Sequence, residues 1–146
     1  MDLNELVEMV KEFNQATFEA EPNGQNLTLI FTYQIGIGIK VFGLEPSTKE
    51  ELQFVLKEVL ARSQPQFYVL SSEGRMRVIP LDDEGLEHQL RVRSTDPELI
   101  IVAGTSRGGH SISWTAEIER SRSRHRKLSP WEQGQLIETN TLILDW

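Results

Sequence analysis

Two stretches of the chain have the hydrophobic spacing of an amphipathic helix. In "DLNELVEMVKEFNQ" the apolar residues recur every three or four positions, and most charged residues fall on the opposite face. "KEELQFVLKEVLARS" repeats this spacing, and either Ser47 or Thr48 can cap it with a glutamate three residues later. The pattern predicts helices over residues 2–19 and 48–63.

Other segments alternate apolar and polar residues with the period of two that is typical of strands. "LTLIFTYQI" and "GIGIKVFGL" predict a hairpin with a turn or bulge at Gly36 and Gly38. "QFYVLSS" and "RMRVIPL" predict a second hairpin joined at Glu73 and Gly74. A short helix is expected in "DDEGLEHQLRV". The predicted strand segments are the hairpins 27–44 and 66–81 and the single strands 98–105, 111–119 and 135–145.

Strands joined by tight turns indicate antiparallel pairing, so the sequence predicts an α+β fold. We expect one domain over residues 1–146, with a mainly antiparallel sheet of about five to seven strands. The N-terminal helix and the second helix are expected to pack together on one face of this sheet. A chain of 146 residues is long enough to bury a self-sufficient core.

Composition removes several classes of function. The chain contains no cysteine, which excludes disulfides, thiolate metal sites and a cysteine nucleophile. Its first residues are acidic and do not resemble a secretory signal, and no apolar run approaches the roughly 20 residues of a membrane span. We therefore expect a cytoplasmic protein that does not contact membranes and needs no cofactor.

The segment "IERSRSRHRKLSPW" concentrates positive charge on an otherwise acidic chain. The formal net charge is −7, and without the five basic residues of this segment ten basic residues would face twenty-two acidic ones, giving −12. The preceding strand places the even positions from Ile112 to Ile118 inward. Continuing that register would bury the arginines, at high cost if they are unpaired. We therefore predict an exposed loop or hairpin tip, with a return limb near Leu128.

A basic arm on an acidic body favours a non-enzymatic protein-binding or regulatory module. Its partner would be a protein with an acidic surface or a second copy of the chain, in a dimer joined by the N-terminal helix or the last strand. A nucleic-acid-binding module using the same arm is the alternative. Trp131 is predicted to be an exposed aromatic anchor beside the arginines. The predicted binding residues are Arg120, Arg122, Arg124, Arg126, Lys127 and Trp131.

A small hydrolase or metal-dependent enzyme is a third hypothesis. Residues 104–108, "GTSRG", fit the G-x-S-x-G pattern of a nucleophile elbow around Ser106. The strand pattern that follows favours a simple glycine-permitted turn, because an elbow precedes a helix. Glu84 and His88 are one helical turn apart in an acidic segment, but such clusters are usually solvated. The sequence therefore predicts no catalytic residue and no metal site.

Overall fold

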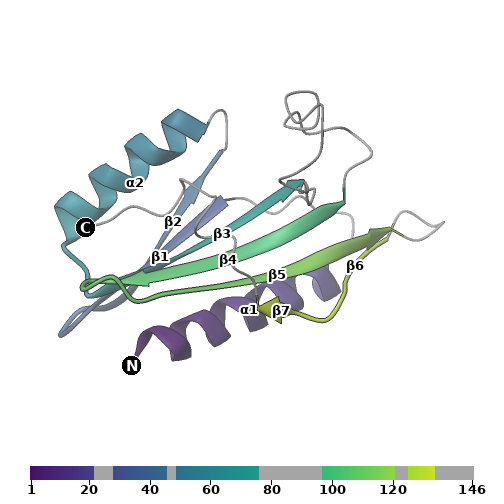
Figure 1. Ribbon diagram of the computed structural model, residues 1–146, viewed down its shortest axis with the longest axis horizontal. Coiled ribbons are helices and arrows are strands. Elements are labelled where there is room, and N and C mark those ends of the chain that lie inside the picture. Colours follow the sequence, from purple (N-terminus) through teal and green to yellow (C-terminus); the bar gives the residue numbers. More distant parts are fainter. Residues whose placement is uncertain (22–27, 46–48, 76–96, 121–124, 134–146) are drawn as a thin grey trace, which may run out of the picture.

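The computed structural model describes residues 1–21, 28–45, 49–75, 97–120 and 125–133. Two helices and seven strands occupy these ranges (Figure 1). The helices are α1 (Leu3–Ala20) and α2 (Lys49–Ser63). The strands are β1 (Thr28–Gln34), β2 (Gly38–Leu44), β3 (Phe67–Arg75), β4 (Glu98–Ser106), β5 (Ser111–Arg120), β6 (Arg126–Leu128) and β7 (Glu132–Gln133).

The strands form one antiparallel sheet, which confirms the predicted α+β fold. Their order is β2-β1-β3-β4-β5-β6, and β7 pairs with β5 beside β6. Strand β1 lies between β2 and β3, so it pairs with β2 through the first hairpin and with β3 across the segment containing α2. From β3 to β6, each strand pairs with the next one in the sequence. The sheet therefore has the long strand β2 at one edge and the short strands β6 and β7 at the other.

Helix α1 packs on one face of the sheet (Figure 1). It begins after Asp2, whose carboxylate accepts a hydrogen bond of 2.8 Å from the backbone N–H of Glu5 and so caps the first turn. Its apolar stripe, which includes Leu6 and Val10, is fully buried against β3, β4 and β5. The polar Asn14 is buried as well, and it donates a hydrogen bond to the Ser71 hydroxyl on β3.

Helix α2 lies on the opposite face, so the prediction that both helices share one face is wrong. The cause is visible in the central strands, where both alternating sets of residues are apolar. Phe31 and Val69 belong to the cluster under α1, whereas Ile30 and Tyr68 belong to the cluster under α2. Strands buried on both faces need a cover on each side.

The first predicted hairpin is present as β1 and β2. Gly36 and Gly38 have φ values of 83° and 100°, and the Ile37 N–H donates to the Gln34 carbonyl at 3.1 Å. Residues with a Cβ atom rarely adopt positive φ values, which explains why glycine occupies both positions. Ile35 and Ile37, at the tip of this hairpin, are exposed.

The turn predicted at Glu73 and Gly74 is wrong, because both residues lie inside β3. They pair with Ile100 and Leu99 of β4, so β3 continues to Arg75, three residues beyond the predicted strand segment. The return limb assigned to residues 76–81 falls outside the described residues. So do the short helix expected after it and the strand predicted over 135–145.

Candidate functional site

The basic segment forms a hairpin between β5 and β6, as the sequence analysis predicted. Ile118 and Leu128 are cross-strand partners and both are buried beneath α1, which confirms that the even positions of β5 face inward. Strand β5 extends to Arg120, and the return limb begins at Arg126, two residues earlier than Leu128. Arg122 and Arg124 lie outside the described residues.

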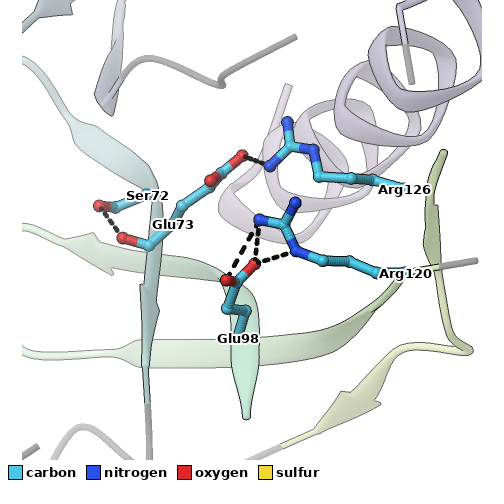
Figure 2. Close-up of polar contacts among 5 residues, drawn as sticks. All are labelled: Ser72, Glu73, Glu98, Arg120 and Arg126. Atoms are coloured by element: carbon cyan, nitrogen blue, oxygen red, sulfur yellow. Dashed lines mark hydrogen bonds and ion pairs between the residues drawn. The ribbon is translucent and has the colours of Figure 1, made fainter. Parts of the chain in front are cut away.

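Arg120 is tied to the body of the protein by an ion pair. Its guanidinium donates two hydrogen bonds to one Glu98 oxygen, at 2.8 and 3.3 Å, and one to the other at 3.2 Å (Figure 2). This two-nitrogen arrangement fixes the guanidinium against the start of β4. Arg120 is therefore exposed, as predicted, but its charge already faces a carboxylate.

Arg126 contradicts the prediction that the whole arginine cluster is exposed. Only 5% of its side chain is accessible, and its Nη1 lies 2.8 Å from a Glu73 oxygen on β3 (Figure 2). The ring of Phe18 on α1 lies 4.7 Å from the guanidinium carbon. The expected cost of burial assumed an unpaired charge, and here a carboxylate and an aromatic face compensate it.

Of the two other predicted binding residues, Lys127 is exposed and Trp131 is partly buried. Lys127 is exposed and lies across the ladder from Glu119, which is also exposed. Trp131 is only partly exposed and packs against the cluster under α1, so it is not the free aromatic anchor that was predicted. Lys11 of α1 lies beneath Trp114 and Trp131, with its Nζ 3.6 and 5.9 Å from the two ring centroids. These tryptophans therefore pack around a lysine of the same chain.

The charge of the basic segment is largely matched where the structure describes it. Arg120 and Arg126 are paired with glutamates, and Lys127 stands opposite a third. A nucleic-acid arm needs cations that are free to replace the counterions of phosphates. The described part of the hairpin offers one such cation, Lys127, beside several exposed carboxylates.

The G-x-S-x-G sequence is a turn between two antiparallel strands, not a nucleophile elbow. Ser106 ends β4, its backbone N–H donates to the carbonyl of His110 at 2.9 Å, and β5 begins at Ser111. Among the described residues, the Ser106 hydroxyl donates only to that same carbonyl, at 3.4 Å. Gly104 lies in close contact with α1, since a methyl group there would lie 2.8 Å from Leu3 Cδ1 and 3.1 Å from Val7 Cγ2.

The described ranges also contain no cluster of three or more metal-ligating side chains. The acidic segment around Glu84 and His88 lies outside them. No helix in the described part of the chain is both long and apolar enough to cross a bilayer.

A feature that the sequence analysis missed is a groove of about 730 Å³ between β2 and α2. Volumes of roughly 300–1,000 Å³ are typical of ligand sites. Figure 1 shows α2 lying over the β2 edge of the sheet. On α2, Phe54 stands at the side of the groove with 66% of its surface exposed. The apolar residues that line the groove are Phe42, Phe54, Val55 and Val59.

Strand β2 adds a hydrogen-bonding edge to this groove. It is seven residues long, and no described strand other than β1 pairs with it. Its apolar side chains occupy both faces: Phe42 lies toward α2, whereas Val41 pairs with Phe31 on the other face and is 53% exposed. Natural proteins usually shorten, charge or cover such edges.

The sequence does carry a signal for this site. "IGIKVFGL" is apolar at odd and even positions alike, which a strand with one solvated face does not need. Phe54 is also a signal, because it falls outside the stripe formed by Leu52, Val55, Leu56 and Val59 on the same helix. Neither signal reveals that the two apolar features meet at one edge of the sheet.

Comparisons with known proteins add no functional information. No family model, curated protein or solved structure matches this chain.

Proposed function

We propose that this protein is a protein-binding module that captures an extended polypeptide segment along β2. The segment would add one strand to the sheet by pairing with the available edge of β2, and its side chains would enter the groove beneath α2. The observation that carries this proposal is the coincidence of an apolar groove with a seven-residue strand edge to which no other described strand is paired.

Strand addition explains both components of the site. Backbone hydrogen bonds along β2 would supply affinity independent of sequence, and the groove would supply selectivity through alternate side chains. A small molecule could fill the groove but would leave the hydrogen-bonding edge and the exposed Val41 unused. The opposite end of the sheet is a poorer template, because β6 and β7 span only three and two of the described residues.

The basic hairpin, from which protein binding was first predicted, is a weaker candidate for the same role. Two of its arginines already form ion pairs with Glu98 and Glu73 of the same chain. An acidic partner would have to compete with these carboxylates. We therefore propose that a protein partner binds at β2 and α2 and not at the hairpin.

Replacing Val41 by Lys and Phe54 by Asp should abolish binding at this edge. Both side chains are mostly exposed, so the double variant should fold with a change of at most about 0.5 kcal/mol per site. The measurement is enrichment of a random heptapeptide display library on the immobilised protein. We expect wild type to enrich peptides that contain alternating or consecutive β-branched and aromatic residues. The double variant should bind these peptides at least about tenfold more weakly, a loss of about 1.4 kcal/mol of binding free energy.

Met9→Lys is the matched control, since Met9 is an exposed apolar residue on α1, away from β2 and α2. It should enrich peptides as wild type does. Absence of enrichment on wild type would overturn the proposal, as would peptides that bind wild type and the double variant equally. Circular dichroism of each variant checks that the fold is retained.

A further inference from the structure

Three charged side chains line the groove, and their sum is positive although the protein is acidic. Lys40 comes from β2, whereas Glu58 and Arg62 come from α2. The net charge of this set is +1, on a chain whose net charge is −7. The groove is therefore a locally basic site within an acidic body.

Neither cation is firmly neutralised within the described residues. Arg62 lies 3.6 Å from Glu58 one helical turn away, and both side chains are at least half exposed. Pairs of this kind are worth only a few tenths of a kcal/mol. Lys40 is exposed and forms no ion pair with the described residues. A ligand carboxylate could accept charge-assisted hydrogen bonds from either group.

The lysine also restricts which strands can pair with β2. A lysine on an edge strand discourages indiscriminate pairing, because a neutral or basic neighbour must leave its ammonium group partly desolvated. An acidic side chain placed across from Lys40 removes that cost. The edge is thus selective rather than simply unprotected.

The register of β2 turns this charge preference into a sequence pattern. Lys40 and Phe42 are two residues apart on the face toward α2, and Val41 lies between them on the other face. A strand paired with β2 would present its side chains with the same alternation. The residue opposite Lys40 would be acidic, and those opposite Val41 and Phe42 would be apolar.

A second copy of the chain satisfies these requirements poorly. It would bring another Lys40 and Arg62 to the same interface, together with a second chain of net charge −7. Like charges placed together oppose association. An acidic segment of a different protein provides the complementary charge that the second copy lacks.

We infer that the partner segment contains an acidic residue next to two consecutive apolar residues; this inference rests on the proposed strand addition. The acidic side chain is held by Lys40 and Arg62, the middle residue contacts Val41, and the third enters the groove beside Phe42. An antiparallel strand would read apolar-apolar-acid from its N-terminus, whereas a parallel strand would read acid-apolar-apolar. The order found in binding peptides therefore reports the direction of the added strand.

The test is the same heptapeptide library, panned on wild type and on a variant with Lys40→Glu and Arg62→Glu. Wild type should enrich Asp or Glu beside two apolar residues. The charge-reversed variant should lose this preference at least about tenfold and enrich Lys or Arg at the same place. Lys57→Glu is the matched control, because Lys57 is exposed on α2 and does not line the groove. It should keep the wild-type preference.

The outcomes separate the two proposals. Enriched peptides without an acid, or an acidic preference that survives charge reversal, would overturn the inference and leave strand addition intact. No enrichment on wild type would overturn both. A dimer in light scattering that Val41→Lys converts to a monomer would show that a second copy occupies the edge, which would also overturn the inference.

Discussion

Replacing Arg126 by Met should lower the free energy of unfolding by about 3 kcal/mol, the lower end of the range for breaking a buried ion pair. Methionine keeps most of the apolar part of the side chain next to Phe18. The loss of stability therefore reports mainly the removal of the positive charge. The Glu73 carboxylate, whose side chain is only 24% exposed, would lose its 2.8 Å partner. Urea denaturation followed by circular dichroism measures the change.

Lys127→Met is the control for Arg126→Met, because it removes a positive charge from the next residue of β6, where the side chain is exposed. It should change stability by no more than about 0.5 kcal/mol. Adding Glu73→Gln to Arg126→Met should cost less than the sum of the two single changes, since the residues share one interaction. Equal losses for Arg126→Met and Lys127→Met would mean that Arg126 is solvated and belongs to an exposed binding arm.

Replacing Gly104 by Ala should destabilise the protein by about 1–3 kcal/mol, the usual cost of overpacking a core. The added methyl group would lie 2.8 Å from Leu3 Cδ1, 3.1 Å from Val7 Cγ2 and 3.2 Å from Val69 Cγ2. The leucine terminus can move, but the two valines are stiff at χ1 and hold their positions between α1 and β3. Thermal or urea unfolding measures the loss.

Gly74→Ala is the matched control for Gly104→Ala, because it adds the same methyl group to a neighbouring strand. Its nearest contact would be Ile101 Cδ1 at an ordinary 3.9 Å, so it should be nearly neutral. Val7→Ala should offset part of the Gly104→Ala loss by making room for the methyl group. If both glycine variants were equally stable, close approach of α1 to β4 would not explain Gly104.

Sequence patterns correctly predicted the elements whose conformation depends mainly on residues close together in the chain. The helix from Leu3 follows from its apolar spacing, and the first hairpin follows from Gly36 and Gly38. The turn expected at Glu73 and Gly74 was wrong because pairing with β4 overrides a local turn signal. The placement of α2 was wrong because the same strands are apolar on both faces, which a period of two does not reveal.

The site depends on contacts between residues far apart in the sequence, which explains why sequence reasoning located it poorly. The burial of Arg126 depends on Glu73, which is 53 positions away. Charge patterning alone therefore suggested an exposed arm. The groove similarly requires β2 and α2 to meet at the edge of the sheet. The sequence could indicate its apolar residues but not that they share one surface.

Amide hydrogen exchange by NMR, with the peptide that the library enriches most, tests strand addition most directly. Pairing along the available edge should slow the exchange of alternate amides between Gly38 and Leu44, and chemical shifts should change in β2 and along α2. Exchange along β2 that stays unchanged, with shifts confined to the β5–β6 hairpin, would contradict the account and return the binding surface to the basic segment.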